Sequence, residues 1–238
     1  MKIVLFLTGN IAPVNVPYLM RGNAQDREND YYIAIKKWLE YKIPIVFCEN
    51  SHYNSLIINE LLEGRNDCEY LKFKTQTSSL GKGNGEAEIF QFAFDNSNLL
   101  KGAKYIIKVT GRYNIINFEA IQSKIKNYDH FYICGNMTHS LSWADSRFFL
   151  FKNSFYHDFL KESLLAINED KNICFEHCLA HAMHLAMSKS YTFKLLPEIP
   201  VYQGYYGGNG KKYDNSWIFQ FRNKIFSYCK YYFFESLS

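Results

Sequence analysis

Short apolar runs alternate with helical patterns through the amino-terminal half of the chain, and this alternation restricts the possible folds more than any other feature. Four apolar or β-branched runs predict strands at residues 2–7, 43–48, 69–74 and 105–110. Helical spacing predicts helices at residues 26–41, 55–62 and from 86 to near 102. Because parallel neighbours need such crossovers, the order predicts a mainly parallel central sheet flanked by helices, an α/β fold of the Rossmann type.

The carboxyl-terminal half has a different pattern. Further strands are predicted at residues 131–134, 147–151 and 191–196, and further helices at residues 155–167 and 175–187. No shift in composition marks a boundary, so we expect both halves to share one sheet and this half to form the second wall of a cleft. The predicted organisation is one catalytic domain at 1–215 and a terminal segment at 216–238.

Composition narrows the class of protein. With 238 residues, of which 47% are hydrophobic, the chain can bury one substantial core. A net charge of +4 suits anionic ligands or an anionic membrane face but is too small to indicate nucleic acid. The six cysteines show no zinc or disulfide spacing, and no apolar run suits a signal peptide or a membrane span. These features predict a cytoplasmic protein with reduced thiols.

Polar residues stand where the predicted strands end. Thr8-Gly9 follows the first strand, Glu49 the second, and Thr110-Gly111-Arg112 the fourth, within YIIKVTGRYNI. Open α/β sheets bind their ligands outside the carboxyl ends of the strands. We therefore expect a ligand site at this edge of the sheet.

Two further features follow these strand ends: a glycine loop that opens a helix, and Glu176-His177 at the start of a later helix. This order of strand ends, loop and helix start resembles the GT-A glycosyltransferases, particularly small enzymes of bacterial lipopolysaccharide and capsule assembly. The resemblance covers most of the chain by the order of its elements. It implies that the first two strands hold the nucleotide, that an Asp-x-Asp motif binds metal, and that a downstream acidic pair supplies the catalytic base. Here Thr110-Gly111-Arg112 stands in place of Asp-x-Asp, and the acidic pair is Glu176-His177.

Arg112 offers a physical reason for that replacement. A diphosphate leaving group gains negative charge as the glycosidic bond breaks, and a guanidinium fork matches its oxygens. We therefore predict a metal-independent glycosyltransferase that uses no other cofactor. The alternatives are that Arg112 pairs with a carboxylate or points to solvent.

Two loops are further candidates for donor binding. In GKGNGEAEIF (81–90), the glycines, Lys82 and Asn84 precede a helix predicted from Glu86, whose free N–H groups suit an anion or a sugar hydroxyl. In GYYGGNGKKYD (204–214), glycines and tyrosines suggest a lid from which Lys211 reaches phosphate. Each segment can instead be an ordinary surface loop.

Two other motifs suggest acceptor chemistry. In WADSRFF (143–149), Asp145 is predicted to accept hydrogen bonds from sugar hydroxyls while Arg147 holds it, the alternative being a surface ion pair. In CFEHCLAHAMHLAM (174–187), Glu176 is predicted to be the base, the alternative being an ordinary charge at a helix start. Cysteines and histidines share one face of that helix, but their spacing does not favour a metal site.

The predicted catalytic residues are Glu176, Arg112 and Asp145, and the predicted donor-binding residues are Thr8, Gly9, Glu49, Lys82, Asn84, Thr110, Gly111, Arg147 and Lys211. The expected partners are a nucleotide-sugar donor and a saccharide or lipid-linked acceptor. WIFQFRNKIFSYCKYYFF (217–234) reads as a basic amphipathic helix that can lie on the inner face of the cytoplasmic membrane, cap the core or form a dimer contact. The alternative function is a noncatalytic or regulatory sugar-nucleotide-binding protein.

Overall fold

The computed structural model describes most of the chain. Its described residues are 2–17, 19–126, 130–207, 209–213, 216, 218, 220–222, 224–226 and 229. The segment predicted at 216–238 therefore lies largely outside the described residues.

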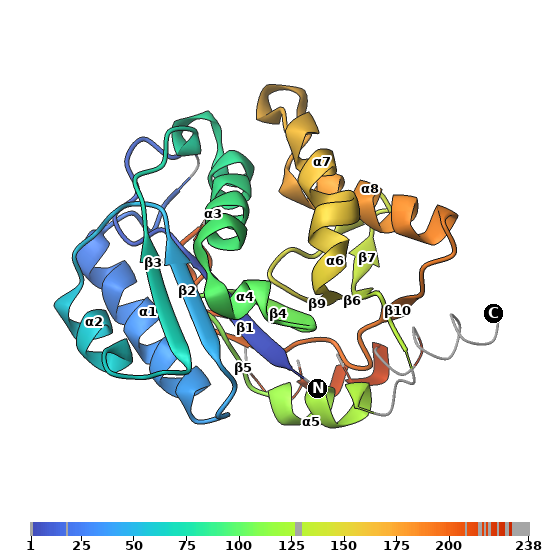
Figure 1. Cartoon of the computed structure of the whole chain (residues 1–238), viewed down its shortest axis with the longest axis horizontal. Helices are drawn as coiled ribbons and strands as arrows, with labels where there is room; N and C mark the ends of the chain where they lie inside the picture. Colours follow the sequence, from blue (N-terminus) through green and yellow to red (C-terminus); the bar gives the residue numbers. More distant parts are fainter. Residues whose placement is uncertain are drawn as a thin grey trace.

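A seven-stranded sheet runs through the described part of the chain in the order β10-β6-β9-β4-β1-β2-β3 (Figure 1). The strands are β1 (Ile3–Gly9), β2 (Ile45–Glu49), β3 (Cys68–Lys72), β4 (Tyr105–Thr110), β6 (Ile133–Gly135), β9 (Phe148–Lys152) and β10 (Phe193–Leu195). All neighbours pair in parallel except those of β9, which runs antiparallel to β4 and β6. The mainly parallel sheet and its sharing by both halves of the chain are thus confirmed.

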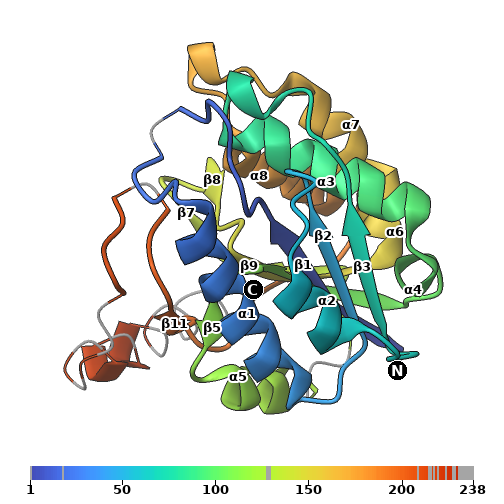
Figure 2. The same cartoon turned by 90° about the vertical axis from the view of Figure 1, so that its left-hand side faces the viewer.

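Helices cover both faces of the sheet (Figure 2). One face packs against α1 (Ala24–Leu39), α2 (Leu56–Leu62) and α5 (Phe118–Ile125), and the other against α3 (Lys82–Asn96), α4 (Asn98–Lys101), α6 (Asn153–Phe155) and α8 (Phe175–Ser188). Side chains of β1 alternate between these layers: Leu5 and Leu7 face the first, Val4 and Phe6 the second. Burial on both faces explains why the central strands are continuous apolar runs.

Shorter elements are also present within the described residues. Two two-stranded sheets pair β5 (Asn114–Ile115) with β11 (Tyr202–Gln203) and β7 (Met137–Thr138) with β8 (Trp143–Ala144). The predicted helix at 155–167 is a succession of short pieces: α6, a π turn at Tyr156–Leu160, α7 (Lys161–Ser163) and a 3-10 turn at Leu164–Ala166. Further 3-10 turns lie at Ser78–Leu80 and Glu169–Lys171.

The predicted start of the third helix was wrong by four residues, because α3 begins at Lys82 rather than Glu86. Glycine weakens a helix by about 1 kcal/mol relative to alanine, so Gly83 and Gly85 indicated a loop. Close contacts explain their presence in the first turn. A Cβ at Gly83 would lie 2.8 Å from the backbone nitrogen of Phe175, and one at Gly85 would lie 3.1 Å from Nδ2 of Asn50.

All six cysteines are free thiols, as predicted. Within the described residues, no helix is both long enough and apolar enough to cross a membrane.

Candidate functional site

A cavity of about 390 Å³ opens at the carboxyl ends of the central strands. Its walls come from both halves of the chain: the ends of β1 and β4, α1 and α3 on one side, and the region from β8 to the start of α8 on the other. Of the predicted site residues, Thr8, Gly9, Lys82, Thr110, Arg112, Arg147 and Glu176 line it. The fold thus gathers residues that are more than 160 positions apart in sequence.

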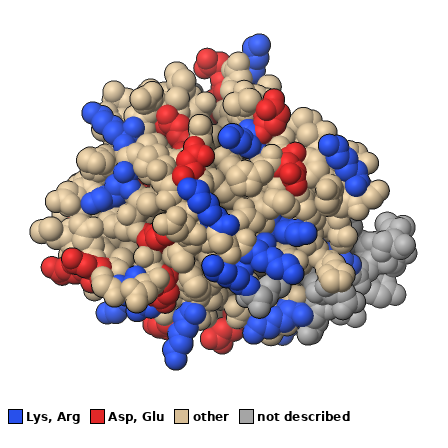
Figure 3. Space-filling view, viewed as in Figure 1, with Lys and Arg blue, Asp and Glu red and all other residues tan. Residues whose placement is uncertain are grey.

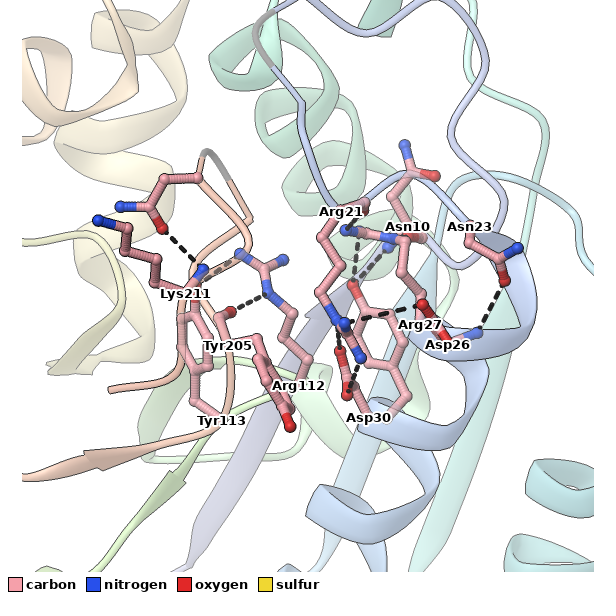
Figure 4. A network of polar contacts seen from close by, with 12 residues as sticks. Asn10, Arg21, Asn23, Asp26, Arg27, Asp30, Arg112, Tyr113, Tyr205 and Lys211 are labelled. Carbon is pink, nitrogen blue, oxygen red and sulfur yellow. Dashed lines mark hydrogen bonds and ion pairs between the residues drawn. The ribbon is translucent and has the colours of Figure 1, made fainter. Parts of the chain in front are cut away.

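Arg112 lies at the end of β4 among tyrosines (Figure 4). Its Nη2 donates to the hydroxyl of Tyr113 at 2.6 Å, its Cζ lies 4.6 Å from the centroid of that ring, and its Nε donates to the carbonyl of Tyr205 at 3.4 Å. No carboxylate forms an ion pair with Arg112 within the described part of the chain. Its positive charge is therefore held by neutral groups beside the cavity.

Two more cations share this end of the cavity. Arg27 of α1, 2% exposed, donates to the carbonyls of Asn10 and Arg21 (Figure 4). Burial lowers the pKa of Arg27, and the charge of Arg112 lowers it further. Lys82 is exposed overall, but partial desolvation, then the charges of Arg112 and Arg27, lower its pKa, whereas Glu169 and Glu176 raise it. These mutual effects indicate a concentration of positive charge suited to an anion.

A chain of polar contacts joins the two walls beneath the cavity. Lys108 of β4 is fully buried, and its Nζ lies 2.5 Å from Oε1 of Glu86 and donates to the carbonyl of Ser146 at 2.6 Å. The hydroxyl of Thr8 also donates to Oε1 of Glu86, at 2.8 Å. On the opposite wall, the hydroxyl of Ser146 donates to Oε1 of Glu176 at 2.7 Å. Lys108 therefore fixes Glu86 directly and Glu176 through Ser146.

The glycine loop already holds an anion from the same chain. The N–H of Gly83 donates to Oε1 of Glu169 at 2.5 Å, beside the positive end of the α3 dipole. Gly81 has φ +146°, and a Cβ there would lie 2.0 Å from the carboxyl carbon of Glu169. The expectation of an anion at this helix start thus fits the structure, but the carboxylate of Glu169 is what occupies it.

Asp145 and Arg147 form a two-pronged ion pair. Nε and Nη2 of Arg147 donate to the two carboxylate oxygens of Asp145 at 2.8 and 2.7 Å. Arg147 also donates to the hydroxyl of Tyr213 at 3.1 Å and stacks over Tyr202, with Cζ 4.3 Å from the ring centroid. The predicted contact between Arg147 and Asp145 is present, although the pair spans a turn before β9 rather than one face of a strand. Asp145 itself does not line the cavity, so its predicted role as an acceptor for sugar hydroxyls stays a prediction.

The other predicted residues lie outside the lining of the cavity. Glu49 is fully buried and accepts from the N–H groups of Ser51 and Tyr53, and burial raises its pKa. Asn84 is half-buried on α3, and Lys211 is exposed. Gly111 does not adopt positive φ; it is needed because a Cβ there would lie 2.9 Å from the carbonyl oxygen of Thr8.

The face of α8 that carries His177 and His184 packs against the hairpin formed by strands β7 and β8 and the turn between them. His177 lies with its ring 5.0 Å from that of Trp143, and its Nδ1 is 3.1 Å from the sulfur of Cys174. Nε2 of His184 lies 2.9 Å from the carbonyl oxygen of Leu141. These contacts attach the hairpin to α8.

Sequence reasoning missed Arg27, Lys108, Ser146 and Glu169. Only Lys108 carries a visible signal, since it is the single charge inside an otherwise apolar strand, YIIKVT. Arg27 resembles any charged residue of an exposed helix, and Glu169 meets Gly83 across 86 positions.

The residues present do not fit the metal ion that the sequence resemblance implies at the end of β4. Such ions take several oxygen ligands, whereas Thr110-Gly111-Arg112 presents a guanidinium. Among the described residues, no group of three or more His, Cys, Asp or Glu is arranged to hold a metal ion.

No protein-family model matches the chain, and no curated protein resembles it in sequence. Among solved structures, the inositol-1-phosphate CTP transferase of T. maritima superposes with a TM-score of 0.50 at 12% identity, covering 82% of this chain and 85% of that one. Core-mannan synthase A of Aspergillus fumigatus, in its Mn/GDP form, gives a TM-score of 0.48 at 9% identity, covering 97% and 85%. The first similarity supports the α/β fold described above.

Proposed function

We propose that this protein is a glycosyltransferase that moves a sugar from a nucleotide-diphosphate donor to a saccharide or lipid-linked acceptor. The observation that carries this proposal is Arg112, a cation at the end of the central strand that no described carboxylate neutralises, in one cavity with Glu176. An anionic ligand would neutralise the positive charge at the Arg112 end of the cavity. The carboxylate of Glu176, on the facing wall, supplies a base.

The cations then act on the donor. Arg112 and Lys82 bind the diphosphate, and they stabilise it more strongly as the bond to the sugar breaks and negative charge develops on the leaving oxygen. Arg27 adds to the positive potential while it fixes the loop after β1. Because these side chains supply the charge, we infer that transfer needs no divalent metal.

Glu176 acts on the acceptor. A base must lie within hydrogen-bond reach of the hydroxyl that attacks the sugar. The Ser146 hydroxyl fixes one carboxylate oxygen of Glu176, which limits its rotation at the cavity wall. Arg147, which lines the same wall and is held by Asp145, is placed to bind sugar hydroxyls.

The decisive experiment is release of nucleoside diphosphate from UDP-, GDP- and CDP-sugars in excess chelator, with wild type and Arg112→Ala compared. We expect wild-type release with one donor class and its loss in the variant. Binding of a sugar nucleotide without release, with and without saccharide acceptors, would instead favour the noncatalytic binding protein.

A second candidate is nucleotidyl transfer, favoured by the similarity to a CTP transferase. Its products differ: a nucleoside triphosphate and a sugar or polyol phosphate would give pyrophosphate. Measuring pyrophosphate and nucleoside diphosphate in the same reactions separates the two activities.

The setting we propose is surface polysaccharide assembly, such as lipopolysaccharide or capsule, at the inner face of a bacterial cytoplasmic membrane. In the terminal segment, Ile218, Phe221 and Ile225 recur at helical spacing and are 49–61% exposed. Figure 3 shows Lys and Arg side chains gathered in the lower centre of one face of the molecule. Flotation with anionic vesicles, compared with neutral ones, tests this contact.

A further inference from the structure

We propose that the β7–β8 hairpin is a saccharide platform, on which the ring of Trp143 stacks against the apolar face of a pyranose unit of the acceptor. The inference rests on the proposed function, because it names the group that occupies the Glu176 side of the same cavity. The proposed diphosphate site and the proposed base do not involve this hairpin, so the inference gives the hairpin a binding role.

Trp143 is placed where an acceptor must lie. It lines the cavity on the wall that also carries Ser146, Arg147 and Glu176, and it is half-buried rather than sealed in the core. The next residue, Ala144, is fully buried, so the strand is anchored immediately beside the ring. An aromatic side chain that lines a cavity offers stacking area to a ligand at low entropic cost.

The hairpin is strained at its turn. His139, Ser140 and Leu141 all have positive φ, at 50°, 55° and 67°, although none is glycine. Such residues cost roughly 1 kcal/mol or more each and persist only where surrounding contacts hold them. Strain of this kind gathers at ligand-binding segments.

Helix α8 supplies the contacts that hold this turn. His184 lies 2.9 Å from the carbonyl oxygen of Leu141, and His177 packs edge-to-face against Trp143. Within the turn, the N–H and hydroxyl of Ser142 donate to the carbonyl of His139 at 3.1 and 2.7 Å. The helix that carries Glu176 therefore also fixes Trp143, which couples the position of the base to that of the platform.

The neighbouring chemistry favours a pyranose. Its C–H face is apolar and suits an aromatic ring, while its edge carries hydroxyls that both donate and accept. Arg147 offers donors at that edge, and the Ser146 hydroxyl and Glu176 offer acceptors. A purely apolar ligand would leave the remaining donors and acceptors of these groups without partners in the ligand, at a cost in affinity.

The test uses the full chain labelled with ¹⁵N, and it follows the indole N–H signals of its tryptophans. Trp143→Phe assigns the signal of Trp143 by its disappearance. The probes are methyl glycosides of glucose, galactose, mannose and N-acetylglucosamine, added with and without UDP, GDP or CDP. We expect at least one glycoside to shift the Trp143 signal, and its ring C–H protons to show saturation transfer from the protein.

Variants separate stacking from folding. Trp143→Ala should weaken glycoside binding about tenfold, whereas Trp143→Phe should keep most of it. Leu165→Ala, at an exposed position outside both the hairpin and the cavity lining, is the control and should bind like wild type. Thermal unfolding checks that each variant is folded.

The outcomes distinguish this inference from the proposed function. Nucleotide binding without any glycoside response at Trp143 would overturn the platform and leave the proposed function standing. A Trp143 signal that responds to nucleosides alone would mean that a nucleobase stacks there and would also overturn it. A glycoside response without nucleotide binding would support the platform and contradict the proposed function.

Discussion

The two walls of the cavity are built differently, and they divide the chemistry between them. The first wall consists of β1, α1, α3 and β4, and it carries Lys82 together with Arg27 and Arg112. Within the described part of the chain, neither guanidinium forms an ion pair with a carboxylate. The second wall is assembled from short elements between β8 and α8. Its cation, Arg147, is paired with Asp145, and it presents Glu176 and Trp143.

The comparison shows on which wall a positive charge is available to a ligand, and on which wall it is already paired with a carboxylate. Parallel strands bring their ends to one edge, where open α/β sheets bind ligands, and Arg112, which no described carboxylate neutralises, lies at that edge. In the proposed mechanism the second wall acts on a neutral hydroxyl, and its cation Arg147 is already paired with Asp145. Lys108 connects the walls, and each of the following predictions tests the division.

The largest expected effect is on turnover through the second wall. Glu176→Gln removes the base but keeps the size of the side chain, so kcat should fall by about 10²- to 10⁴-fold while nucleotide affinity stays near wild type. Steady-state kinetics and nucleotide titration measure the two quantities. Glu162→Gln, on the exposed surface, is the control. Near-normal turnover would remove Glu176 from the mechanism and make His177 the next candidate.

The link between the walls should be important for stability. Lys108→Met leaves Glu86, whose side chain is 22% exposed, without its charged partner, although the Thr8 hydroxyl still donates to it. We expect the free energy of unfolding to fall by about 3 kcal/mol, measured by urea denaturation. Lys104→Met, at an exposed site before the same strand, should change it by less than about 0.5 kcal/mol. If Lys108→Met were as mild as the control, the ion pair would not hold the walls together.

The first wall should affect both binding and turnover. Arg112→Ala should weaken nucleotide binding and lower kcat by about 10²- to 10³-fold, because its charge is used most strongly during bond cleavage. Arg112→Lys should rescue part of the loss, since an ammonium lacks the two-pronged geometry. Arg65→Ala, which removes a surface ion pair with Asp67, serves as the comparison. Activity lost in chelator and restored by Mg²⁺ or Mn²⁺ would contradict the metal-independent role.

The smallest expected effect is a pH dependence of nucleotide affinity. Partial desolvation and the nearby guanidiniums lower the pKa of Lys82, so its ammonium loses its proton at a lower pH than an ordinary lysine. Only the protonated form attracts the diphosphate, so affinity should fall, by tenfold or less, as the pH rises through that lowered pKa. Bound diphosphate stabilises the protonated form of Lys82, so the fall in affinity is shifted to a higher pH. Lys82→Arg should abolish this dependence, and a flat wild-type profile would exclude Lys82 from binding.

The first wall was largely predictable from sequence. Its strands are apolar runs that end at polar residues, and the parallel arrangement brings those ends together, so Thr8 and Arg112 were expected in one place. The second wall was less predictable. Its elements are too short to show a period, and the π turn at Tyr156–Leu160 interrupts the helix that the pattern indicates.

The errors have one physical cause, which is contact between distant segments. Glycine propensity indicated a loop at 81–85, but Glu169 and Phe175 hold those residues in a helical turn. Glu49 was expected at the ligand because it ends a strand, yet the following turn uses its carboxylate. Neither outcome is visible in the local sequence.

The close fit of Glu169 into the start of α3 has a consequence for tracing the ancestry of this chain. A side chain at position 81 would overlap the carboxylate of Glu169, and a Cβ at position 83 would lie 2.9 Å from Oε1 of the same carboxylate, so substitutions at positions 81, 83 and 169 cannot be independent. Relatives too divergent for overall identity to detect should keep a Gly-x-Gly paired with a downstream acid, or change both together. That long-range pairing is a better search signature for this lineage than any continuous motif.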